Sequence, residues 1–137
     1  FIANLPADAL PQPPLPTPIL IANGTQDPFV LYNGGRAEMN RALLRSTPST
    51  VNYWRKANGV WGVKGITHAL PDRDRSDDCR LIETRYLNTQ GEVMVDFIEM
   101  KGGTHKIPSR LAEHYPGNCR DAEGADLAWN FMSQHSR

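Results

Sequence analysis

Apolar positions along the chain change their spacing several times, and each spacing predicts a different element. A continuous apolar run over 19–22, bounded by turn residues, is typical of a strand buried on both faces of a sheet. Two alternating runs, 80–86 and 92–100, are joined by the turn 88–91 and predict a β-hairpin. Apolar residues recur at helical spacing in three further segments, which are 36–45, 49–57 and 122–135. The pattern therefore predicts a mixed α/β fold with helices beside the sheet.

Turn and cap residues set the expected ends of these helices. Pro48 disfavours helix at Thr47, so the helix over 36–45 is expected to end before it. Ser49 has the side chain of an N-cap for the next helix, which Asn58-Gly59 would end. Residues 59–78 contain glycines, a proline and a run of charges, and we expect them to be irregular.

The first 18 residues differ from the rest of the chain. Their prolines exclude helix and central strand, so residues 1–18 are expected to form an extended connector before one domain over 19–137. The chain begins with Phe1, and no charged-then-apolar leader precedes it. We expect either a mature product or a piece of a longer protein.

Composition limits the classes of partner that are expected but does not indicate an activity. The 15 basic and 15 acidic residues balance, so no nucleic acid or anionic membrane surface is predicted as a partner. No apolar run approaches the roughly 20 residues that a membrane helix needs. Cys79 and Cys119 lie far apart without CxxC spacing. They either form a disulfide in an exported protein or are two separate buried thiols.

Two residues whose side chains can take part in catalysis directly follow predicted strands. Asp27 comes after the first strand and its turn, and Pro28 holds it on an extended loop. His105 follows the last strand and Gly102-Gly103, which permit a sharp turn and close backbone approach. Taken singly, Asp27 has the simpler interpretation of an Asx turn, and His105 that of a surface or structural histidine. Together they occur in the order acid, then histidine, of an α/β-hydrolase triad.

Further segments extend this match along the chain. They are Asn23-Gly24-Thr25-Gln26-Asp27-Pro28, Tyr32-Asn33-Gly34-Gly35, Trp54 with Asn58-Gly59, Gly102-Gly103-Thr104-His105, and the terminal segment 129–135. With these segments the chain resembles the C-terminal half of the polyhydroxybutyrate depolymerase and feruloyl esterase group of secreted α/β-hydrolases. The resemblance implies the C-terminal portion of an α/β-hydrolase sheet with flanking helices, an ester substrate, no cofactor, and a secreted or periplasmic location.

The resemblance also assigns roles to individual residues. It implies that Asp27 is the acid of a Ser-Asp-His triad and that His105 is its general base. The family often follows its histidine with an aromatic residue and a proline, whereas this chain has Ile107 before Pro108. Ile107 is thus the candidate substrate-binding residue, and the change leaves polyester or feruloyl specificity open.

The nucleophile of such a triad is absent from the chain. No serine stands in Gly-x-Ser-x-Gly, and neither cysteine fits that turn. In the family's order the serine and the oxyanion loop precede the acid, so this chain would hold an acid and a base but no nucleophile for them to activate. We expect half of a secreted serine esterase, inactive alone, with its serine in an N-terminal half or a second chain. The alternative is a non-catalytic fragment or interaction module that retains half of the fold.

Such a half-sheet would leave an apolar edge and an apolar face uncovered. We therefore expect the chain to be paired with a partner, dimeric or prone to aggregation.

Metal sites and ligand-stacking surfaces are predicted to be absent. Asp72-x-Asp74-x-Ser76 with Glu83 partly matches a calcium loop, but its sixth position is not glycine and arginines interrupt it, so a solvated charged loop is expected. The remaining histidines have no zinc-ligand spacing; they are His68, His114 and His135. Four aromatic residues at helical spacing are expected in the core, namely Tyr53, Trp54, Trp129 and Phe131.

Overall fold

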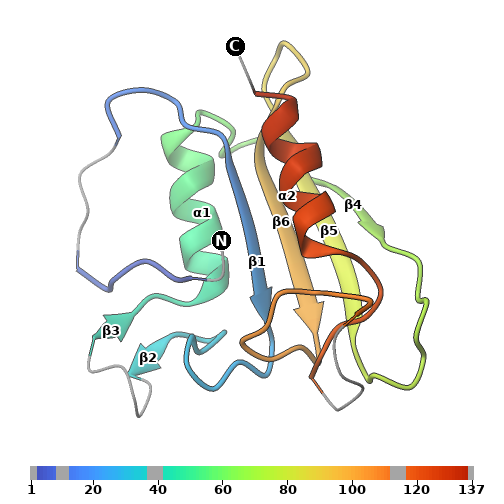
Figure 1. Ribbon diagram of the computed structural model, residues 1–137. Helices are drawn as coiled ribbons and strands as arrows, with labels where there is room; N and C mark the ends of the chain where they lie inside the picture. The colour runs from blue at the N-terminus through green and yellow to red at the C-terminus, as the bar shows by residue number, and fades with distance from the viewer. Residues whose placement is uncertain (1–2, 9–12, 37–41, 112–116, 136–137) are drawn as a thin grey trace.

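The computed structural model describes residues 3–8, 13–36, 42–111 and 117–135 (Figure 1). These residues form a four-stranded sheet, a two-stranded sheet and two helices. In chain order the elements are β1 (Ile19–Gly24), β2 (Gly35–Arg36), β3 (Leu43–Leu44), α1 (Thr47–Ala57), β4 (Ile66–Ala69), β5 (Arg80–Leu87), β6 (Val93–Lys101) and α2 (Gly124–Ser133). The predicted mixed α/β fold is confirmed.

The larger sheet has the strand order β1-β6-β5-β4. β1 runs parallel to β6, with Ile19 opposite Val95 and Gly24 opposite Met100, while β5 is antiparallel to both β6 and β4. The predicted hairpin of β5 and β6 is confirmed. Because β1 and β6 are parallel, their carboxyl ends lie at the same edge of the sheet, where the loops carrying Asp27 and His105 begin (Figure 1).

A helix covers each face of this sheet. Ile21 on β1 packs in a core cluster with Val51 of α1, whereas its neighbours Leu20 and Ala22 pack in a second cluster with Phe131 of α2. Alternate residues of a strand point to opposite faces, so α1 and α2 lie on opposite sides of β1 and β6. The expectation of an uncovered apolar face is therefore wrong for these two strands. β1 has no second strand partner among the described residues.

Cys79 and Cys119 form a disulfide bond, with their Cα atoms 5.2 Å apart. Both residues are buried and belong to the core cluster beneath α2. The disulfide, one of two alternatives open from sequence, links the start of β5 to the segment that precedes α2.

The predicted helix over 36–45 is wrong where its residues are described. Arg36 lies in β2 and Leu43–Leu44 form β3, which pairs with β2; residues 37–41 lie outside the described residues. The next helix begins two residues before Ser49, because Ser46 is its N-cap and accepts a hydrogen bond from Ser49 N. Pro48 lies in its first turn, where a missing N–H costs no helical hydrogen bond. The predicted end at Asn58-Gly59 is confirmed, with Gly59 at φ +70°.

Two smaller expectations also change. The segment 59–78 is not wholly irregular, because it contains β4, an exposed edge strand without a periodic apolar pattern. Tyr53 and Phe131 are buried and Trp54 packs against the core, but Trp129 is 67% exposed on the outer side of α2. The charged loop is exposed at Arg75, as expected, and its Asp72 forms ion pairs with Arg75 and with Arg80 of β5.

The Pro-rich segment before β1 lies against other elements where it is described. Leu5 N donates to Thr50 Oγ1 of α1, and Thr17 N donates to the Asn58 side chain at the end of that helix. Residues 1–2 and 9–12 lie outside the described residues. In the described part of the chain, neither helix has the length and apolar character to span a bilayer.

Candidate active site

Backbone contacts join the two loops that leave β1 and β6. Thr25 N donates to Met100 O at 3.0 Å, and Gln26 N donates to Gly103 O at 3.0 Å. Gly102 N in turn donates to the Thr25 hydroxyl at 2.9 Å. A Cβ on Gly24 would clash with the carbonyl of Gly103, so glycine is required at the point where the loops touch. These contacts align the end of each strand with the end of the other.

Asp27 lies between the two loops and is 3% exposed. Its Oδ1 accepts hydrogen bonds from Phe29 N and Val30 N, both at 2.8 Å. Its Oδ2 lies 2.8 Å from Nδ1 of His105. The Asx turn and the acid–histidine pair are thus both present, since each uses a different oxygen of one carboxylate.

Among the described residues, the imidazole of His105 has a hydrogen-bond partner at Nδ1. A carboxylate can only accept a hydrogen bond, so Nδ1 donates to Asp27 and carries a proton. In the neutral ring Nε2 is then an acceptor, as a general base requires. The His105 side chain is 39% exposed. Within the described residues, no serine hydroxyl bonds to this ring.

Phe29 also contacts His105, although sequence reasoning did not single it out. Its ring meets the imidazole edge-on, with centroids 5.5 Å apart and an angle of 78° between the planes. Phe29 follows Pro28 in the loop that Asp27 caps, and it is 41% exposed. The sequence carries no pattern that marks this contact, because the two rings meet only when the two loops fold against each other. Phe29 adds an apolar wall beside the histidine.

The predicted substrate-binding residue follows His105 in the loop that leaves β6. Ile107 is 56% exposed, and its Cγ2 lies against Gly124 at the start of α2. Pro108, which follows it, is fully buried and accepts a hydrogen bond from Gly124 N at 2.8 Å. Ile107 is close to His105 in the sequence, and its contact with a substrate stays a prediction.

The far end of the loop after Asp27 is anchored to the sheet and to α1. Tyr32 donates its hydroxyl to Glu99 of β6 at 2.7 Å, and its carbonyl accepts from Thr47 N at 2.8 Å. Burial and the neighbouring Glu99 carboxylate raise the pKa of Tyr32, so this hydroxyl stays protonated as a donor. Asp27 and Tyr32 therefore fix the loop at both ends.

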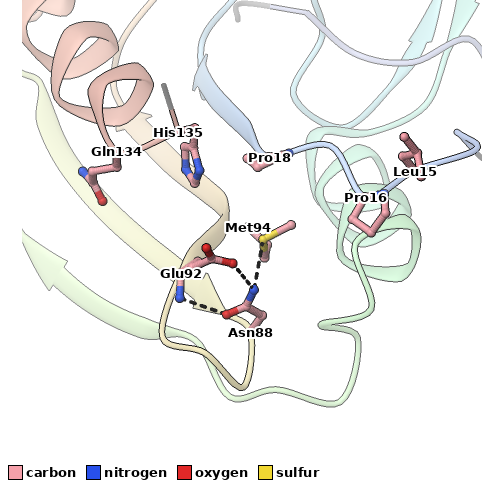
Figure 2. A pocket seen from close by; sticks show the side chains of 8 residues that line it. All are labelled: Leu15, Pro16, Pro18, Asn88, Glu92, Met94, Gln134 and His135. Carbon is pink, nitrogen blue, oxygen red and sulfur yellow. Dashed lines mark hydrogen bonds between the residues drawn. The ribbon is translucent and has the colours of Figure 1, made fainter. Parts of the chain in front are cut away.

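A cavity of about 600 Å³ lies elsewhere in the structure (Figure 2). It is bordered by the segment before β1, the β5–β6 turn and the end of α2. Asn88 in this turn donates to Glu92, and His135 lies on the opposite side of the opening (Figure 2). Because β1 and β6 start near this cavity and end near Asp27 and His105, the cavity and the acid–histidine pair lie at opposite edges of the sheet.

A second group of titratable side chains lies across the sheet. His68 of β4 contacts Glu83 at 3.0 Å, Glu83 contacts Arg85 at 2.9 Å, and Arg85 lies 3.6 Å from Asp96. Glu83 and Asp96 are both buried. Burial, reinforced by the Glu83 carboxylate and opposed by Arg85, raises the pKa of Asp96 from 3.8 to about 7.

This raised pKa predicts how stability depends on pH. The folded state binds the Asp96 proton more tightly than the unfolded state, so the free energy of unfolding falls as pH rises from about 4 to 7. Asp96→Asn is expected to remove this loss, roughly 4 kcal/mol, and to stabilise the chain above pH 7. Urea unfolding at pH 5 and pH 8 measures the effect. Asp126→Asn, at an exposed site, is the control, and equal pH slopes for Asp96→Asn and wild type would contradict the prediction.

Among the described residues, no group of three histidine, cysteine or acidic side chains is arranged to hold a metal ion. Asp74, one residue of the partial calcium pattern, accepts hydrogen bonds from the backbone N–H and hydroxyl of Ser76. His114 lies outside the described residues.

Comparison with known proteins finds one informative similarity. No protein-family model matches the chain. Feruloyl esterase B of Piromyces equi is 27% identical over 129 residues, which cover 91% of this chain and 19% of that protein. The chain therefore spans about a fifth of the length of the curated relative that it matches. The chain is thus distantly similar to part of an esterase.

Proposed function

We propose that this chain is the C-terminal segment of a serine carboxylic-ester hydrolase with an α/β-hydrolase fold. It would supply the acid, Asp27, and the general base, His105, of a Ser-Asp-His triad. The observation that carries the proposal is the 2.8 Å contact between Asp27 Oδ2 and His105 Nδ1 at the carboxyl ends of two parallel strands. In open α/β sheets this edge is where ligands bind.

The proposed chemistry follows from the two nitrogens of His105. Nε2 would take the proton from a serine hydroxyl as the oxygen attacks the ester carbonyl, and would then return it to the leaving alcohol. Asp27 would hold the ring in the required tautomer and stabilise the imidazolium that forms in between. Its own orientation is fixed by the N–H groups of Phe29 and Val30. Phe29 and Ile107 would form apolar borders of the substrate site.

The serine and the oxyanion hole are proposed to lie outside this chain, in an N-terminal half of the same protein or in a second chain. The small share of the esterase relative that the chain covers supports a larger parent protein. The Cys79–Cys119 disulfide supports a secreted or periplasmic location, because disulfides persist in oxidising compartments.

The proposal predicts a difference between the chain and the longer protein. The 137-residue chain alone is expected to release no ferulate from methyl ferulate above the uncatalysed rate, because it offers a base but no nucleophile. The longer protein should hydrolyse this ester or p-nitrophenyl acetate, and a fluorophosphonate probe should label a serine outside residues 1–137. Labelling of a serine within the chain would contradict this placement of the nucleophile.

The alternative is a non-catalytic module that retains the fold without its reaction. A parent protein without Gly-x-Ser-x-Gly before the chain, and without fluorophosphonate labelling, would favour this alternative. The contact between Asp27 and His105 would then have only a structural role.

A further inference from the structure

The turn that carries His105 lies against a part of the chain other than the Asp27 loop. Gly103 packs against Cys119, and a Cβ at Gly103 would lie 2.9 Å from the cysteine sulfur. Gly102, at φ +84°, packs against the carbonyl of Asp78. The backbone N–H and the hydroxyl of Thr104 both donate to Gly117 O at 3.1 Å. The segments 77–79 and 117–120 thus pack against the turn, and we call them the floor segments.

Two links join the floor segments to each other. One is the Cys79–Cys119 disulfide. The other is the carboxylate of Asp77, which is fully buried and accepts from Cys79 N at 2.8 Å with one oxygen and from Arg120 N at 2.6 Å with the other. The carboxylate and the disulfide therefore hold the same two segments together within a few residues of each other.

This arrangement meets a need of the His105 turn. Gly102 and Gly103 have no side chains that restrict the backbone, so neighbouring groups have to set the position of the imidazole. On one side the turn bonds to the Asp27 loop through Gln26 N, and on the other side it rests on the floor segments. A shift of the floor segments would carry Thr104 with it and move the adjacent His105 relative to Asp27.

We propose that Asp77 and the Cys79–Cys119 disulfide are positioning groups that hold the imidazole of His105 against the carboxylate of Asp27. The proposal deepens the proposed function and rests on it for its catalytic consequence. Its geometric part concerns only where His105 lies. Neither Asp77 nor the disulfide touches the reacting atoms.

Asp77→Asn tests this proposal with the disulfide intact. The carboxamide has one acceptor oxygen for two backbone N–H groups, so it loses either the contact with Arg120 N, which joins the floor segments, or the contact with Cys79 N, which orients the side chain toward Arg120. We expect the downfield proton NMR resonance of the hydrogen-bonded Nδ1 proton of His105, assigned by its absence in His105→Gln, to broaden or disappear. In the longer protein kcat should fall roughly 10- to 100-fold while KM stays unchanged, as for a misplaced catalytic group.

Asp121→Asn is the matched control. Asp121 is also buried and also accepts from two backbone N–H groups, those of Arg73 and Asp74, but it does not join the floor segments to each other. Both N–H groups bond to the same oxygen of Asp121, so the carbonyl oxygen of the new carboxamide can still accept both, and the His105 resonance and kcat should stay unchanged. Equal effects of the two variants on these readouts would show a general loss of stability and overturn the proposal.

A second variant covers the case in which Asp77→Asn does not fold. The double variant Cys79→Ala/Cys119→Ala removes the other link, and circular dichroism establishes whether it is folded. If either folded variant keeps both the Nδ1 resonance and kcat of wild type, the group that it removes is not a positioning group. If the longer protein has no esterase activity, the proposed function fails, and the Nδ1 resonance alone still decides whether Asp77 positions His105.

Discussion

Asp27→Asn is expected to lower the kcat of the complete enzyme by roughly 10⁴. The effect is specific because Asp27 uses its two oxygens differently. After the substitution, the carbonyl oxygen of the new carboxamide can still accept from Phe29 N and Val30 N, which keeps the loop in place. The NH₂ group of the carboxamide then points at His105 Nδ1 and donates to it, so the proton moves to Nε2 and the base is lost.

Ester hydrolysis by the longer protein measures this effect as kcat and KM separately. KM should change little, because Asp27 is buried and does not line the substrate site in the proposed mechanism. Asp121→Asn serves as the control, since it makes the same chemical change at a buried carboxylate that also caps two backbone N–H groups. Turnover close to wild type in Asp27→Asn would remove Asp27 from the triad and leave it as the Asx-turn residue alone.

Loss of the Cys79–Cys119 disulfide is expected to have the largest effect on stability. The two residues are 40 positions apart, and closing a loop of this length restricts the unfolded chain by roughly 4 kcal/mol in the chain-entropy treatment. Both cysteines also lie in the core cluster beneath α2, so replacing them by alanine removes packed sulfur atoms as well.

Equilibrium urea unfolding of the chain and of Cys79→Ala/Cys119→Ala, followed by tryptophan fluorescence, measures this difference. The single variants Cys79→Ala and Cys119→Ala should each lose about as much stability as the double variant, because either one breaks the bond. A loss below about 1 kcal/mol in the double variant would contradict the prediction. This measurement uses the free energy of unfolding and is independent of esterase activity.

The elements that could be predicted from sequence are those whose signal is local. The apolar run of β1, the alternation of β5 and β6 and the stop at Asn58-Gly59 depend on a few adjacent residues, and all are present. The helix over 36–45 was wrong at its described ends because a short amphipathic run also suits a strand pair. There β3 pairs with β2 and also bridges to Pro6 of the N-terminal segment. Helix propensity is weak enough for such tertiary contacts to override it.

The residues of the candidate site also differ in whether the sequence could predict them. Asp27 and His105 could be singled out because each follows a predicted strand and their order is that of a hydrolase triad. Phe29 and Asp77 could not be assigned, since one acts through a ring contact with His105 and the other through backbone N–H groups 2 and 43 positions away. Contacts of this kind leave no periodic pattern in a sequence.

The sequence by itself determined the mixed α/β composition, the glycines at the loop contacts, the absence of Gly-x-Ser-x-Gly and the identity of the candidate acid and base. Only the tertiary structure decided the parallel pairing of β1 with β6, the bond between Cys79 and Cys119, and the 2.8 Å approach of Asp27 to His105. The physical reason is the range of the interactions. Turns, caps and apolar spacing act over a few residues, whereas the acid and the histidine are 78 positions apart and meet only because two parallel strands end at one edge of the sheet.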